Sequence, residues 1–197
     1  KQGQPVKLRL RAKGIDLGLF YPSWKIHREI ADSNSELKGI EAFLDYEYYH
    51  EQDRVILKSF RIYQEDLGEL CVQASFLGLN PAALLSAQNP FVLIASLLSL
   101  KIEHIQAGYE DLGLIEKLNK YRDSEQVEEY INQLFHDEQL RNPIKGLVHR
   151  QDPLILKVNP REPAPVSAIL LSQSMDRVQK LINLELTNTE MEFCVYK

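Results

Sequence analysis

Apolar and polar residues alternate along much of this chain, and the alternation predicts β-strands. It is clearest at residues 70–76, where Leu70, Val72, Ala74 and Phe76 alternate with Cys71, Gln73 and Ser75. A period of two is that of a strand whose two faces meet different surroundings. We therefore expect residues 70–76 to form the central strand of an antiparallel meander, with the four apolar side chains on one buried face.

The same period recurs on both sides of this segment. Residues 41–63 predict a hairpin with a polar turn at residues 50–53, and its first strand carries Ala42, Leu44, Tyr46 and Tyr48 on one face. Cations fill every polar position of residues 6–13, which suits a strand at the edge of a sheet: Lys7, Arg9, Arg11 and Lys13. Further strands are predicted at residues 98–102, 154–158, 184–186 and 191–195.

The tripeptide Asp-Leu-Gly occurs at residues 16–18, 66–68 and 111–113. Aspartate and glycine favour turns, so we expect these three positions to mark the ends of strands.

Helices are predicted mainly in the second half of the chain. Asn80 and Asn89 each precede a proline, the residue best tolerated at the first helical position, so two short helices should start there, the second ending near Leu97. Helical spacing or a capping pattern predicts further helices at residues 114–121, 123–135 and 175–182. Asn142 and Pro143 predict one more helical turn, and residues 166–171 an apolar turn.

These elements predict an α+β fold in which an antiparallel β-meander packs against a group of short helices. The sequence has 197 residues, enough for one large or two small domains. Prolines at residues 160–165 predict a stiff, extended linker. We therefore divide the chain into a main α+β domain at residues 1–159 and a linker with a small helix-strand unit at residues 160–197, packed on the same core.

The composition limits the setting only in part. The longest apolar stretch, residues 91–100, is about half of the ~20 residues that span a bilayer, so it predicts core. Two cysteines, Cys71 and Cys194, match no disulfide framework, zinc motif or redox motif, so we expect two buried thiols and leave the redox compartment open. The sequence starts at Lys1, so an amino-terminal signal or membrane anchor before it is also left open.

The elements follow one another in a fixed order: strand, Asp-Leu-Gly turn, strand, residues 109–118, paired helices, residues 154–158 and the Pro-x-Pro segment. This order resembles that of a class of uncharacterised bacterial cell-envelope proteins. The resemblance covers residues 41–186 and implies a periplasmic location with one amino-terminal membrane anchor. It implies no activity. A cytoplasmic location is the alternative, because the basic residues 1–13 would tend to stay on the cytoplasmic side of a membrane.

Catalytic signatures are weak. Glu47 and His50 have a spacing used in di-iron sites, but on a strand they face opposite sides, and no second pair exists. A catalytic histidine would require folding to gather residues such as His104 and His136. We therefore assign no catalytic residue, metal ligand or cofactor, and keep a metal-dependent or acid-base enzyme as an alternative.

Binding is the leading hypothesis. The cationic side chains Lys7, Arg9, Arg11 and Lys13 suit phosphates of nucleic acid or lipid, although an ordinary solvated edge is favoured because the net charge is −5 and no nucleic-acid motif is present. Aromatic residues suggest a hydrophobic groove for an apolar ligand or partner strand, with packing in the hydrophobic core as the alternative: Tyr46, Tyr48, Tyr49, Phe60 and Tyr63. Within these sets we single out the four cations with Tyr46, Tyr48 and Phe60. The sequence thus favours a non-enzymatic envelope module that recognises a protein partner or apolar ligand, with a cytosolic adaptor using the basic strand as a further alternative.

Overall fold

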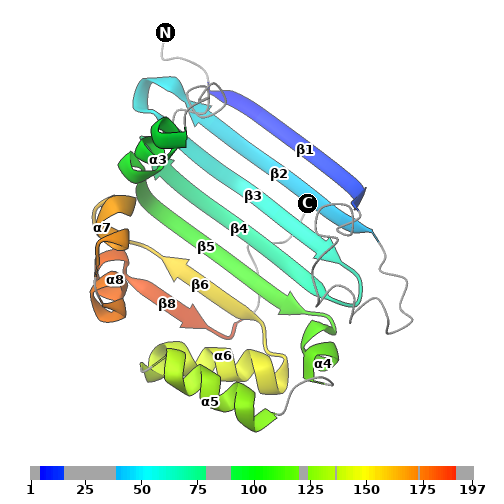
Figure 1. The fold of residues 1–197 in the computed structure, drawn as a ribbon. Coiled ribbons are helices and arrows are strands. Elements are labelled where there is room, and N and C mark those ends of the chain that lie inside the picture. The colour runs from blue at the N-terminus through cyan, green and yellow to red at the C-terminus, as the bar shows by residue number, and fades with distance from the viewer. Residues whose placement is uncertain are drawn as a thin grey trace.

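The computed structural model describes residues 5–15, 39–78, 90–119, 124–135, 137–172 and 174–189. Within them the chain forms one antiparallel eight-stranded sheet in the order β1-β2-β3-β4-β5-β6-β8, with β7 paired to β5 (Figure 1). The strands are β1 (Val6–Ile15), β2 (Ile40–Tyr49), β3 (Arg54–Gln64), β4 (Gly68–Leu77), β5 (Lys101–Asp111), β6 (Leu154–Val158), β7 (Ala164–Pro165) and β8 (Leu184–Thr187). The antiparallel meander order fits the predicted fold, with β4 in the middle of the row.

The helices are short and lie beside the later strands. They are the 3-10 helix η2 (His50–Gln52), α3 (Pro90–Ser99), α4 (Leu114–Asn119), α5 (Ser124–Leu134), α6 (Glu138–Arg150), α7 (Val166–Leu170) and α8 (Met175–Ile182). Figure 1 shows α3, α7 and α8 together at one end of the sheet, and α5 beside α6. The sheet and these helices define an α+β fold.

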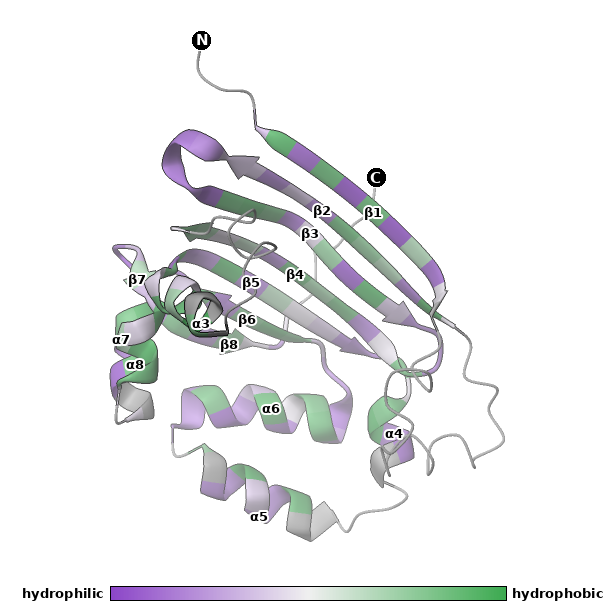
Figure 2. Cartoon of the chain, turned by 45° about the horizontal axis from the view of Figure 1, so that its top comes forward, coloured by the Kyte–Doolittle hydropathy of each residue, from purple (hydrophilic) through white to green (hydrophobic). Residues whose placement is uncertain are grey.

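The register of the sheet gives it one apolar face. Leu8 of β1 lies opposite Tyr46 of β2, which lies opposite Leu57 of β3 and, in turn, Ala74 of β4. The pairing continues through Ile105 of β5 and the apolar residues of β6 and β8. We call this side the apolar face and the other side the polar face. Figure 2 shows the alternation of hydrophilic and hydrophobic residues along β1.

The prediction for β4 is only half right. Its four apolar residues do share the apolar face, but of these only Ala74 is fully buried, at 4% exposure. On the polar face Cys71 is buried to 2% exposure, and Ser75 is buried as well. Burial therefore does not follow the alternation of β4, because buried residues occur on both faces and Leu70, Val72 and Phe76 are only partly buried.

Three β-bulges keep the apolar face continuous. Register shifts occur between Leu57 and Phe60 of β3, within residues 102–105 of β5, and between Ala12 and Ile15 of β1. In each place two non-apolar residues stand between two apolar ones. A bulge places an extra residue on one strand, so both flanking apolar side chains return to the same face.

The apolar face is covered by helices near β5, β6 and β8. Val158, Ala164 and Ile182 form a buried cluster, and Ile169 of α7 and Val178 of α8 pack against it. Ile155 of β6 lies on the other face, because it pairs with Gly108 in the same row as Cys71, and it is buried to 2% exposure. Helix α6 packs against β6 and β8. Asn188 holds this corner together, because its amide donates to the carbonyl oxygens of Pro143 and Pro153.

Two Asp-Leu-Gly segments lie against each other. The carbonyl oxygen of Leu67, in the β3-β4 turn, accepts hydrogen bonds from the backbone N–H groups of Leu112 and Leu114. Asp111 then accepts from the N–H of Ile115 and so caps α4. The segment at residues 66–68 therefore closes a hairpin, and the segment at residues 111–113 starts a helix. The segment at residues 16–18 lies outside the described residues.

Other boundaries confirm or correct the predictions. Helix α8 has the predicted bounds, and α3 starts at Pro90 as predicted but continues to Ser99, so placing Leu98 in a strand is wrong. Pro143 does not open a helix; it lies inside α6, whose start is capped by Asp137. The helix predicted after Asn80 and the strand at residues 191–195 fall outside the described residues. In the part of the chain that the structure describes, no helix has the length and apolar character needed to cross a membrane.

Candidate functional site

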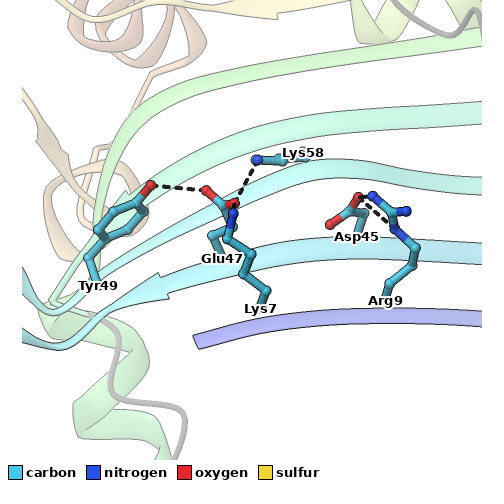
Figure 3. A network of polar contacts seen from close by, with 6 residues as sticks. All are labelled: Lys7, Arg9, Asp45, Glu47, Tyr49 and Lys58. Atoms are coloured by element: carbon cyan, nitrogen blue, oxygen red, sulfur yellow. Dashed lines mark hydrogen bonds and ion pairs between the residues drawn. The ribbon is translucent and has the colours of Figure 1, made fainter. Parts of the chain in front are cut away.

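Ion pairs join the cations of β1 to carboxylates of β2 on the polar face. Arg9 binds Asp45 through two nitrogens, at 3.1 Å and 2.7 Å from Oδ2, and Figure 3 shows this pair. The Nζ atoms of Lys7 and Lys13 lie 2.8 Å and 2.9 Å from Glu47 and Glu41. Arg11 lies 3.4 Å from Glu41. The structure therefore places all four predicted cations in ion pairs within the sheet.

Glu47 is the centre of this network. Its carboxylate accepts from Lys58 at 2.7 Å, Lys7 at 2.8 Å and the hydroxyl of Tyr49 at 2.9 Å (Figure 3). The residue is only 4% exposed. Hydrogen bonds from Lys58 and Lys7 lower the pKa of Glu47 to about 2, in spite of its burial. Glu47 is therefore ionised at any ordinary pH, which makes it a structural anchor and a poor proton donor.

The β1 strand itself remains open to solvent. The side chains of Lys7 and Arg9 are 66% and 72% exposed, although each binds a carboxylate. On the apolar face Val6, Leu8 and Leu10 are 49%, 37% and 52% exposed. Both faces of β1 are thus accessible to a partner.

The aromatic residues divide between the two faces. Tyr46, Tyr48 and Phe60 lie on the apolar face, whereas Tyr49 and Tyr63 lie on the polar face, so the five do not line one groove. Tyr48 is buried, its hydroxyl donates to Asp53 at 2.8 Å, and burial raises its pKa. Its ring meets that of His50 edge to face, with centroids 4.4 Å apart. Tyr48 thus supports the β2-β3 turn.

A pocket of about 180 Å³ lies at the other end of the β2-β3 pair. Its lining comes from Arg11, Glu41, Ala42, Phe43, Arg61 and Tyr63. Arg61 lies over the ring of Tyr63, 5.7 Å from its centroid, and its Nε is 2.6 Å from Glu69. Since Arg11 and Arg61 both already bind carboxylates, an incoming anion would have to compete with them.

The residues considered for acid-base or metal chemistry are engaged elsewhere or lie apart. His50 begins η2, and Glu47 of the proposed Glu-x-x-His pair is held by two lysines. Glu103, next to His104, binds Arg54 at 2.7 Å and accepts from Ser75. His136 lies outside the described residues. Among those that are described, no three potential metal ligands come together.

Sequence reasoning missed the structural roles of Lys58, which binds Glu47, and of Glu103, which was considered only for acid-base chemistry and binds Arg54. The signal was present, because each belongs to a polar pair between apolar residues. It also missed the state of Cys71: a buried free thiol was predicted, but Cys71 is disulfide-bonded. Cys194, the only other cysteine in the sequence, lies outside the described residues. No spacing rule could have shown this bond, since two cysteines far apart in sequence give no framework.

Compared with protein-family models, curated proteins and solved structures, the chain matches none of them.

Proposed function

We propose that this chain is a non-enzymatic binding or assembly module of the bacterial cell envelope, which recognises a protein partner or an apolar ligand along the β1 side of its sheet. One observation carries the proposal. Leu8 and Leu10 continue the apolar face to the edge of the sheet, where they are 37% and 52% exposed. An exposed apolar stretch with a polar surround is typical of an interaction surface.

The ion pairs beneath β1 support this role. They join β1 to β2 through Arg9 and Lys7 on the polar face, and they do not involve the apolar side chains of β1. Cross-strand pairs of opposite charge stabilise a sheet, so the surface offered to a partner is preformed.

The disulfide at Cys71 supports the envelope location. Disulfides persist in oxidising compartments such as the bacterial periplasm and are rare in the cytosol. The location can be tested by trapping thiols with a maleimide while cells are lysed in denaturant, which exposes the buried Cys71. Protection of Cys71 until reductant is added supports the envelope, whereas immediate labelling favours the cytosolic adaptor.

The binding surface can be tested with the hydrophobic dye 1-anilinonaphthalene-8-sulfonate. We expect a saturable rise in emission that falls strongly in Leu8→Ser and Leu10→Ser. Leu171→Ser is the matched control, because Leu171 is even more exposed, at 81%, but lies next to α7. Equal dye binding by all variants would overturn the proposal for β1.

The proposal that the protein is not an enzyme is tested by a separate measurement. A broad panel of hydrolase substrates should give no turnover by the purified protein. Turnover that is lost on His104→Ala would contradict the proposal and restore the acid-base enzyme.

A further inference from the structure

Within the described residues, β1 is the strand at one edge of the sheet. Among the described strands β1 pairs only with β2 and ends the row that β8 closes on the other side. An edge strand presents N–H and C=O groups that another extended chain can pair with. At ten residues, β1 is long enough to hold a strand of ordinary length.

We propose that a partner protein adds an extended segment to β1, and that acidic residues alternate with apolar residues in this segment. The inference rests on the proposed function and names the chemistry of the partner. Backbone hydrogen bonds to β1 would supply affinity, and the two rows of side chains would supply specificity.

Strand β2 already shows which sequence fits β1. Asp45 and Glu47 lie opposite Arg9 and Lys7, while Leu44 and Tyr46 lie opposite Leu10 and Leu8. Directly opposed residues of antiparallel strands point to the same face, so a strand added at this edge meets the same two rows. The cations can serve both neighbours, because the four side chains are 57% to 72% exposed.

A second copy of β1 is a poor partner, because its side chains do not complement those of the first copy. In an antiparallel pair with one parity of register, Lys7 would oppose Lys13 and Arg9 would oppose Arg11, and like charges directly opposite destabilise a sheet. With the other parity each cation would oppose an apolar residue. That pairing would break the apolar face.

Nucleic acid is also disfavoured. The cations of β1 lie beside three carboxylates, those of Glu41, Asp45 and Glu47, which would repel a phosphate backbone. A protein strand also faces these carboxylates, but it gains backbone hydrogen bonds and apolar contacts with Leu8 and Leu10 that a phosphate backbone does not offer.

The test uses the whole protein and labelled peptides with blocked ends. The first peptide has the sequence of β2, residues 40–49; the second replaces its acidic residues with lysine; the third has the same composition with the acidic residues grouped together. By fluorescence anisotropy we expect saturable, salt-sensitive binding of the first, and binding at least about tenfold weaker for the other two, since several attractive pairs become repulsive or are lost. Using altered peptides leaves the fold of the protein unchanged.

The site is located by amide exchange and by substitution. Amides of β1 should become protected when the first peptide is added. Leu10→Lys should weaken binding, and Leu171→Lys, at a more exposed position away from β1, should not. Equal binding of all three peptides, protection only outside β1, dimerisation through β1, or tighter binding of a single-stranded oligonucleotide would each overturn the inference.

Failure of the inference can be separated from failure of the proposed function. If the dye still binds at Leu8 and Leu10 but the first peptide does not bind, only the acidic-apolar strand is overturned. If neither binds, both are overturned.

Discussion

Lys58 donates to Glu47 across the β2-β3 pair, with Nζ 2.7 Å from Oε1. Lys58 stands in the bulge between Leu57 and Phe60, where β3 has an extra residue. The bulge keeps both apolar neighbours on the apolar face and allows Lys58 to reach a buried carboxylate on the polar face. Glu47 in turn binds Lys7, so one carboxylate links three strands.

We expect Glu47 to make the protein sensitive to acid. Its folded-state pKa of about 2 lies below its ordinary value of 4.5, so the ionised carboxylate stabilises the fold fully above about pH 5. That contribution is lost as the pH falls from about 4.5 towards 2. Glu47→Gln should therefore lower the free energy of unfolding at pH 7, and its difference from the unmodified protein should shrink below pH 4 in urea titrations.

Glu41→Gln is the matched control for this prediction. Glu41 lies on the same strand and pairs with Lys13 and Arg11, but its side chain is 41% exposed. Exposed ion pairs stabilise little, so its effect at pH 7 should be clearly smaller. An equal effect of the two changes would contradict the central role of Glu47.

Tyr109→Phe should destabilise the junction of the two Asp-Leu-Gly segments. The Tyr109 hydroxyl lies 3.1 Å from the carbonyl oxygen of Leu67 and 3.1 Å from Asp111. Burial raises the pKa of Tyr109 and so keeps the hydroxyl protonated. Losing this hydrogen bond should cost about 1 kcal/mol in chemical denaturation. Tyr130→Phe, at a 60% exposed position of α5, should be neutral.

The disulfide should contribute measurably to stability. Reduction of the protein should lower its free energy of unfolding by about 2–5 kcal/mol, the usual range for a native disulfide. Cys71→Ser should have a similar effect, and adding reductant to this variant should cause no further change. Mass spectrometry after thiol alkylation without reductant gives the second readout, and two labelled cysteines there would contradict the bond at Cys71.

Ile155→Ala should be among the most destabilising truncations. Ile155 is fully buried at 2% exposure, and removing its side chain leaves a cavity where α6 packs on β6 and β8. We expect a loss of about 2–5 kcal/mol in urea denaturation. Leu171→Ala, which is 81% exposed, should change stability by less than about 0.5 kcal/mol. Similar losses for the two variants would place the core elsewhere.

Local sequence determined the elements because their signals need only near neighbours. Alternation located β1 to β4, and the observed cap of α8, where Ser174 accepts from the N–H of Arg177, uses residues three apart. The bulges after Leu57 and Ile102 were not predicted, although a pair of non-apolar residues between apolar ones marks each of them. Two boundaries were predicted wrongly: Pro143 was interpreted as a helix start and lies inside α6, and Leu98 was placed in a strand and lies in α3.

Only the tertiary structure decided which residues meet. The period of two assigned Lys7 and Arg9 to one face, but Glu47 and Asp45 come to them from about 40 positions away, through a register that the sequence does not reveal. The same holds for the bond at Cys71. Periodicity fixes the face of a side chain because it depends on backbone geometry alone, whereas its partner depends on how distant strands align.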